Sequence, residues 1–408
     1  MTEPGRWRTA VVATWRGVRD GWLMLGIALC LFGALEGGYR LQAGLRRAIR
    51  GTRPTAPAPA TAARNPYADS AWFRTLLAER SRIAFRWEPF VYSRHTPSRG
   101  RYVNSDSGGL RVVPRYRVPG GKPIRVFAFG GSTTWGFFDR DSNTAPAVEA
   151  RQLAAAGYDA EVVNFGQLGY VSAQEVIALV RELRRGNIPD AVIFLDGVND
   201  VSSARANGTP GVSYREFERA TDADFNAARR ARGLLVDDAT ALRTLASHSS
   251  LLARLFAFVA RPAVLPPLPE PVAFCRGVMG DWLRQAQFID HLASAYGFVA
   301  IVIWQPQWET SDRPRTAFER FLEANPGLTA AESGLEAHRR ECARVADSLV
   351  AAHAAESMVN LARLFAADTG TVFLDRNSHT SERTTAIEAD TITSLLVRRL
   401  ARRSQASR

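Results

Sequence analysis

A serine in a glycine-rich turn is the first feature of this sequence that could do chemistry. Ser132 stands in the segment FGGSTTWG (129–136), directly after the apolar run IRVFAF (124–129). The glycines allow a tight turn, which would leave the serine at the carboxyl edge of a sheet, where open α/β sheets bind ligands. A helix starting there would favour a developing oxyanion through its N-terminal N–H groups. Taken alone, the segment is also typical of a helix N-cap without chemistry.

Two further loops follow the next two apolar runs. Gly169 lies in NFGQLGY (164–170), and Asn199 lies in GVND (197–200). A glycine N–H and an asparagine amide are the donors that an oxyanion hole uses. Either loop alone is typical of an ordinary turn. Three such loops at successive strand ends predict a single site with Ser132, Gly169 and Asn199 at one edge of a sheet.

The elements that position these loops alternate between strands and helices. The strands are short, nearly continuous apolar runs, which fits strands buried on both faces of a parallel sheet. Helical patterns lie between them, and this order predicts a three-layer α/β/α sandwich with about five parallel strands. The predicted strands are 124–129, 161–165, 191–195, 298–304 and 358–361, and the predicted helices are 147–156, 173–185 and 279–296.

The three segments resemble the first three sequence blocks of the SGNH/GDSL hydrolases. By position, Ser132 matches the nucleophile, Gly169 the glycine of the second block and Asn199 the asparagine of the third. The resemblance implies the flavodoxin-like SGNH fold and hydrolysis of a small-molecule or glycan acyl ester. It also implies an oxyanion hole formed by the Ser132 N–H, the Gly169 N–H and the Asn199 amide, with no cofactor and no metal. Segments 102–110 and 305–306 are similar to a membrane-anchored bacterial subgroup.

The fourth block of this family is Asp-x-x-His, just before the last helix. His379 fits this position, because the segment from Thr380 to Leu400 has the pattern of a final helix. Asp375 lies four residues before His379 rather than three, and Arg376 occupies the strict acid position. Two arrangements follow. Asp375 orients the imidazole across one extra loop residue, or Ser132 and His379 work as a dyad with a backbone carbonyl as the orienting group.

The N-terminal part predicts a membrane anchor followed by a linker. Residues 21–35 carry no charge, and the apolar stretch extends to Leu41 if Glu36 lies near the interface. A single signal-anchor helix is favoured over a cleaved signal peptide or a buried core helix. Arginines flank both sides, so charge does not set the orientation. The resemblance implies a bacterial inner-membrane protein with a periplasmic catalytic domain.

The predicted organisation has four parts. Residues 1–50 form a cytoplasmic tail and single transmembrane anchor, and 51–64 a Pro/Ala-rich linker. Residues 65–120 are predicted to form loops and short strands that pack on the catalytic domain. That domain spans 121–408, with a helical insertion at about 208–275.

The chain is strongly basic, with a net charge of +12 and a pI near 10.4. No basic stripe interleaved with aromatic residues is found, so we expect no nucleic-acid partner. No Cys/His spacing is typical of a metal site. Cys275 and Cys342 could pair if the domain is exported, but sequence does not give their separation.

Three functions fit these patterns. The first is a serine esterase or deacylase acting on an acyl, most simply acetyl, ester of a carbohydrate or lipid. The second is an O-acyltransferase that modifies a surface polysaccharide, working with a membrane-bound acyltransferase partner. The third is a membrane-tethered scaffold with a decayed site, for which the displaced Asp375 is the single favouring feature.

Overall fold

The computed structural model describes residues 6–51, 64–213, 249, 265–329, 332–353 and 357–406. Most of the predicted linker and most of the predicted insertion lie outside these residues. The described chain divides into two units, one containing the first helix and the other containing residues 64–213 and 265–406. The second unit carries every residue of the predicted site.

The N-terminal helix α1 runs from Arg6 to Gly51. Its segment Arg19–Gln42 is long and apolar enough to cross a membrane. The apolar side chains of this segment are exposed, as those of a membrane-facing helix would be. Glu36 forms an ion pair with Arg40 one turn later, at 2.7 Å, which lowers the cost of placing a carboxylate in an apolar helix.

The central sheet has five parallel strands in the order β4-β3-β5-β6-β7. All five strands predicted from the sequence are present, so the predicted α/β/α fold is confirmed. β5 and β6 are buried along their whole length, as expected for central strands. The strands are β3 (Lys122–Gly130), β4 (Tyr158–Asn164), β5 (Ala191–Asp196), β6 (Val299–Trp304) and β7 (Met358–Asn360).

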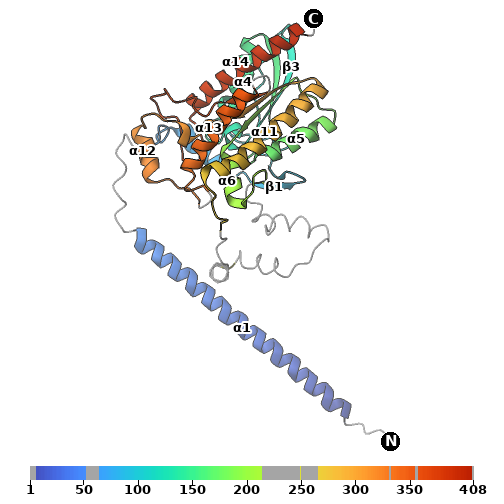
Figure 1. Ribbon diagram of the computed structural model, residues 1–408. Coiled ribbons are helices and arrows are strands. Elements are labelled where there is room, and N and C mark those ends of the chain that lie inside the picture. The colour runs from blue at the N-terminus through green and yellow to red at the C-terminus, as the bar shows by residue number, and fades with distance from the viewer. Residues whose placement is uncertain are drawn as a thin grey trace. The chain divides into compact units, whose positions relative to one another are not determined.

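Alternate side chains of these strands point to two separate cores. On one face, Phe127, Phe129 and Phe194 pack with α5, α6, α11 and α13. On the other, Val126 and Ile193 pack with α4 and α14. Figure 1 shows the resulting three layers. The helices are α4 (Ala145–Ala155), α5 (Ser172–Arg184), α6 (Val198–Asn207), α11 (Pro271–Tyr296), α13 (Glu336–Ala352) and α14 (Glu382–Ala406).

The segment before the sheet differs in part from its prediction as loops and short strands. It contains the antiparallel hairpin β1 (Phe85–Glu88) and β2 (Tyr92–His95), but also the helix α2 (Ala71–Arg80). Phe73 of α2 is buried against Phe318 and Leu374, and Leu76 packs near Trp135. These tertiary contacts stabilise a helix that has little amphipathic pattern of its own.

A disulfide joins α11 and α13. Cys275 and Cys342 are bonded and fully buried, with their Cα atoms 5.0 Å apart. The sequence left this pairing open, because 67 positions separate the two residues. Cys30 of α1 is a free, exposed cysteine.

Candidate active site

Ser132, His379 and Asp375 form a continuous hydrogen-bonded chain. Ser132 Oγ lies 2.6 Å from His379 Nε2, and His379 Nδ1 lies 2.6 Å from Asp375 Oδ2. Ser132 and His379 are separated by 247 positions, so the fold alone brings them together. An acid, an imidazole and a hydroxyl in this order can transfer the hydroxyl proton to the imidazole as the oxygen attacks.

Ser132 is the first residue of the short helix α3 (Ser132–Trp135), which begins immediately after β3. Two side chains from neighbouring strand ends fix this helix. Asn164 Nδ2 donates to the Thr134 carbonyl at 2.9 Å, and Gln305 Nε2 donates to Thr133 Oγ1 at 3.3 Å. The nucleophile position is therefore held by the ends of β4 and β6 as well as by its own strand.

One of the two predicted oxyanion donors, Asn199, lies beside this turn. Asn199 is in the first turn of α6, and its Nδ2 donates to the Tyr170 carbonyl at 2.8 Å. The same amide lies so close to Gly131 that a Cβ at this position would collide with it, which explains the glycine before Ser132. Gly169 precedes Tyr170 and has a φ of 74°, a conformation that glycine adopts without strain.

Buried carboxyl groups lie next to the Asn199 turn and stabilise it. Asp200 accepts hydrogen bonds from Ser172 N and Oγ, at 3.0 and 2.8 Å, and from Gly197 N at 3.0 Å. Burial raises the pKa of Asp196 well above its usual range, and the charge of Asp200 acts in the same direction. Asp200 thus links the loops after β4 and β5.

The extra residue between Asp375 and His379 is accommodated by one left-handed residue. Ser378 has a φ of 66°, and its hydroxyl accepts a hydrogen bond from Trp308 N at 2.9 Å. This turn lets Asp375 Oδ1 accept from the N–H groups of Asn377 and His379, at 3.0 and 3.2 Å, while Oδ2 reaches the imidazole. Of the two arrangements left open by the sequence, the geometry favours Asp375 as the orienting group.

Arg376, in the strict acid position of the fourth block, points away from the imidazole. Its guanidinium lies over the Trp308 ring at 4.8 Å and forms long ion pairs with Glu309 at 3.8 Å and Glu336 at 3.7 Å. Glu309 is also paired with the buried Arg339 at 2.9 Å. Arg376 therefore anchors the loop to α13.

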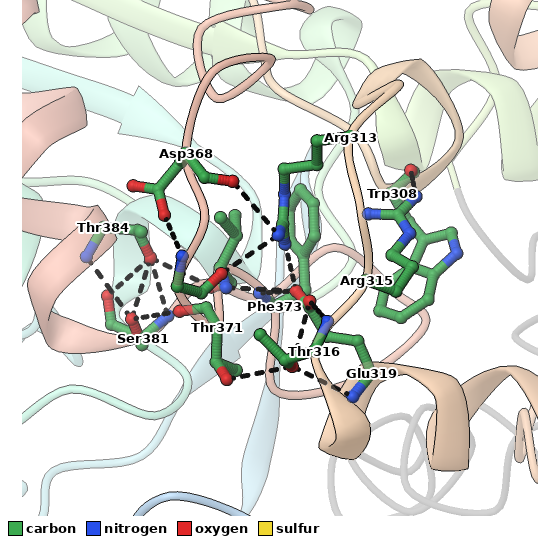
Figure 2. A network of polar contacts seen from close by, with 12 residues as sticks. Trp308, Arg313, Arg315, Thr316, Glu319, Asp368, Thr371, Phe373, Ser381 and Thr384 are labelled. Carbon is green, nitrogen blue, oxygen red and sulfur yellow. Dashed lines mark hydrogen bonds and ion pairs between the residues drawn. The ribbon is translucent and has the colours of Figure 1, made fainter.

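A fully buried ion pair between Arg313 and Glu319 also holds the chain that enters this loop (Figure 2). Glu319, in the short helix α12 (Ala317–Ala324), pairs with Arg313 and accepts the N–H groups of Val372 and Phe373 at 3.1 and 3.3 Å. Arg313 Nη1 donates to the Gly370 carbonyl at 3.0 Å. The chain entering the Asp375 turn is thus fixed by charge-assisted hydrogen bonds.

Two residues that the sequence did not single out also contact the site. Phe137 stacks on the His379 imidazole, with ring centres 4.2 Å apart and planes inclined by 20°. The guanidinium carbon of Arg80, the last residue of α2, lies 3.7 Å from the centre of the Phe137 ring. No spacing in the sequence links Arg80 to Ser132, since α2 lies outside the four blocks.

In the part of the chain that the structure describes, no group of three or more His, Cys, Asp or Glu side chains is arranged to hold a metal ion. His95 ends β2, His291 and His338 lie on α11 and α13, and His353 directly follows α13. His248, the sixth histidine, lies outside the described residues.

Neither a scan of protein-family models nor a search of the curated proteins finds a match to this chain. Solved structures do match, over about two thirds of the chain. They include a member of the lipolytic protein G-D-S-L family from Veillonella parvula, with 13% identity, 67% of this chain and 97% of that chain covered, and a TM-score of 0.35.

Two further matches are esterases. A carbohydrate acetylesterase family member from Sinorhizobium meliloti has 14% identity, covers 68% of this chain and 99% of its own, and has a TM-score of 0.34. The inhibitor-bound aryl esterase of M. smegmatis has 16% identity, coverages of 68% and 99%, and a TM-score of 0.36.

Proposed function

We propose that this protein is a serine esterase that removes an acyl group, most simply acetyl, from a carbohydrate or lipid ester. The observation that carries this proposal is the Ser132–His379–Asp375 hydrogen-bonded chain, with both contacts to the imidazole at 2.6 Å. The position of Ser132 at the end of β3, beside the Asn199 amide, supports it.

The first half of the reaction acylates the enzyme. Ser132 Oγ attacks the ester carbonyl carbon while His379 Nε2 takes the hydroxyl proton. The negative charge that develops on the carbonyl oxygen is stabilised by the N–H groups of Ser132 and Gly169 and by the Asn199 amide. When the tetrahedral intermediate collapses, the carbon–oxygen bond to the alcohol breaks, and His379 gives its proton to the leaving alcohol.

The second half releases the acid. A water molecule attacks the acyl-serine carbonyl as His379 Nε2 takes one of its protons. Collapse of the second intermediate breaks the bond to Ser132 Oγ, which takes the proton back from His379. Asp375 keeps the proton of Nδ1 directed at its carboxylate throughout, and so fixes the tautomer with a free Nε2 and stabilises the imidazolium.

The location of the enzyme is also part of the proposal. α1 carries a segment able to cross a membrane, and the folded unit contains the buried Cys275–Cys342 disulfide. Disulfides persist in oxidising compartments and are rare in the cytosol. We infer that α1 anchors the protein in the inner membrane and that the esterase unit lies on the periplasmic side.

Hydrolysis of p-nitrophenyl acetate by the full chain in detergent tests this function. We expect nitrophenol release that is lost, by about 10³-fold or more, in Ser132→Ala and in His379→Ala. Ser249→Ala is a matched control, because this serine is in the other unit of the chain. Equal rates for wild type and Ser132→Ala, in preparations with the same circular dichroism spectrum, would reject the proposal.

Acceptor dependence separates hydrolysis from acyl transfer. An esterase releases acetate from p-nitrophenyl acetate at a rate that does not require added sugar. If acetate appears on an added oligosaccharide instead, and nitrophenol release depends on that oligosaccharide, the same residues serve an O-acyltransferase.

A further inference from the structure

We propose that Arg80 is an anion-binding residue of the substrate site, so that the preferred ester carries a carboxylate or phosphate group near the reacting carbonyl. This inference rests on the proposed function and narrows its substrate class. Arg80 comes from α2, in the segment that precedes the sheet, rather than from a strand end.

The side chain of Arg80 is partly buried but has no ion-pair partner among the described residues. Its one hydrogen bond runs from Nη1 to the Phe137 carbonyl, at 2.8 Å. Nε and Nη2 form no hydrogen bond with the described chain, yet neither is enclosed by protein. Several N–H donors of a partly desolvated cation therefore remain open to a ligand.

The aromatic contacts of Arg80 leave these donors free. The guanidinium carbon lies 3.7 Å from the centre of Phe137 and 4.9 Å from the centre of Phe138. Stacking uses the flat face of a guanidinium, whereas its N–H groups point outward in the plane, where they can bind an oxyanion through two parallel hydrogen bonds.

The distance from Arg80 to the His379 imidazole suits a small substrate. Phe137 stacks on His379 at 4.2 Å, and the imidazole and the guanidinium cannot share one face of this ring. Arg80 and His379 therefore lie on opposite faces of Phe137. The two stacking distances place the guanidinium carbon within about 8 Å of the imidazole centre, a separation that one sugar or aromatic ring can span.

Nearby charges compensate the charge of Arg80 only in part. Burial lowers the pKa of Arg80 to about 10, the charge of Asp375 opposes this shift, and the smaller effect of Arg111 adds to it. Asp375 is already bonded to His379, while Glu79, the neighbouring residue, accepts the N–H groups of Arg101, Tyr102 and Val103. A bound oxyanion would supply the missing partner.

Three other arginines around the site are paired with carboxylates. Arg313 is paired with Glu319, Arg140 with Glu382 at 2.6 Å, and Arg111 with Asp141 at 2.5 Å. These three are tied to carboxylates within the fold. Arg80 therefore differs from them in having donors that the described part of the chain does not use.

Matched esters test the proposal on the full chain in detergent. We would measure kcat/KM for 4-acetoxybenzoate, 4-acetoxyphenyl phosphate and the neutral methyl 4-acetoxybenzoate. The variants are Arg80→Gln and Arg80→Lys, with the exposed Arg82→Gln as the matched control. The ratio of kcat/KM for an anionic ester to that for the neutral ester cancels differences in overall activity.

We expect this ratio to fall by about 10-fold or more in Arg80→Gln, because a charge-assisted hydrogen bond is lost, and to be unchanged in Arg82→Gln. Arg80→Lys should recover part of it. The preferred group is the one, carboxylate or phosphate, whose ester shows the larger fall of this ratio in Arg80→Gln. An Arg80→Gln variant that loses the same factor on all three esters would show that Arg80 only supports the stack, and would overturn the proposal.

Binding to Ser132→Ala separates this inference from the esterase itself. If no ester is hydrolysed in a Ser132-dependent way, the proposed function fails, but binding of 4-acetoxybenzoate can still be titrated calorimetrically. We expect Kd to rise by about 10-fold or more when Arg80→Gln is added to Ser132→Ala. Equal affinities, or no heat of binding in either variant, would contradict an anion site at Arg80.

Discussion

At the scale of single residues, the orienting acid depends on one unusual backbone conformation. A non-glycine residue with positive φ is uncommon, and Ser378 adopts it inside the turn that joins Asp375 to His379. The hydrogen bond from Trp308 N to the Ser378 hydroxyl helps to hold this conformation. The turn thereby absorbs the additional residue and leaves Asp375 Oδ2 in contact with the imidazole.

Asp375→Asn tests whether the acid works as the geometry indicates. The amide would stabilise neither the imidazolium nor the required tautomer, so we expect kcat on p-nitrophenyl acetate to fall by about 10²–10⁴-fold with KM little changed. Asp368→Asn is the control, because Asp368 pairs with Arg383 rather than with His379. A loss smaller than about 3-fold in Asp375→Asn would instead indicate a Ser–His dyad.

The sequence predicted these residues to different degrees. Ser132, Gly169 and Asn199 each follow a buried strand, so the rule that parallel strands share a carboxyl edge was enough to group them. The register of Asp375 depends on the φ of Ser378, which no propensity for serine predicts. Arg80 belongs to a segment without strong periodicity, and its place over Phe137 arises only from tertiary packing.

At the scale of elements, α12 is tied to the loop that carries Asp375 and His379. Glu319 pairs with Arg313 inside the protein and accepts two backbone N–H groups at the start of that loop (Figure 2). It also caps its own helix by accepting Thr316 N at 3.0 Å. One buried carboxylate thus connects three segments of the chain.

A double-mutant cycle measures this connection. Glu319→Leu leaves a buried guanidinium without its partner, so we expect the free energy of unfolding to fall by about 3–5 kcal/mol. Adding Arg313→Met removes the stranded charge and should restore part of that loss. The readout is urea unfolding followed by circular dichroism. If the double variant loses as much stability as Glu319→Leu and Arg313→Met lose together, the ion pair is not the connecting element.

The hairpin before the sheet supports α3 through a stack of rings. His95 of β2 lies between Phe85 and Trp135, with ring centres at 4.7 and 4.8 Å, and Trp135 is the last residue of α3. Burial lowers the pKa of His95 to about 4, and the charge of Arg111 acts in the same direction. The folded protein therefore keeps this imidazole neutral below the pH at which the unfolded chain protonates it.

Because of the lowered pKa of His95, the free energy of unfolding falls as the pH drops from 6.5 to about 4. The unfolded state takes up a proton near pH 6.5 and the folded state only near pH 4, so the His95 contribution is complete above pH 6.5 and is lost between these values. The loss amounts to about 3 kcal/mol. Urea unfolding at several pH values should show this slope in wild type and a reduced slope in His95→Phe. An unchanged slope would mean that other groups cause it.

The strands could be predicted from the sequence because each contains a short, nearly continuous apolar run. No such pattern marks α2 or α12. α2 is stabilised by contacts of Phe73 and Leu76 with distant elements rather than by a helical pattern of its own. The buried pair of Arg313 and Glu319 reads in the sequence as two solvated charges. Long-range packing and buried charge pairing therefore limited the prediction at this scale.

At the scale of the whole molecule, the folded unit is cross-linked between two helices on the same face of the sheet. Cys275 and Cys342 join α11 to α13, and both also contribute to the core on that face. This bond restricts the unfolded chain, because 67 positions separate the cysteines. The two cysteines alone gave no indication of their distance, which only the folded arrangement of the helices defines.

Removing the disulfide should lower the stability of the protein without disturbing the site. For a closed loop of this length, chain entropy predicts a loss of about 4 kcal/mol in the free energy of unfolding. We expect dithiothreitol, or Cys275→Ser with Cys342→Ser, to lower Tm by several degrees, while Cys30→Ser has no such effect. Identical Tm values with and without reductant would contradict a structural disulfide.

The central claim is that Ser132 is an activated nucleophile, and covalent trapping tests it most directly. A fluorophosphonate reacts when a serine oxygen attacks phosphorus and fluoride leaves, so the adduct marks the nucleophile itself. Mass spectrometry of the labelled full chain should locate one adduct on the peptide that contains Ser132, and His379→Ala should suppress it. An unmodified Ser132 in folded protein, or an adduct on another serine, would contradict the account.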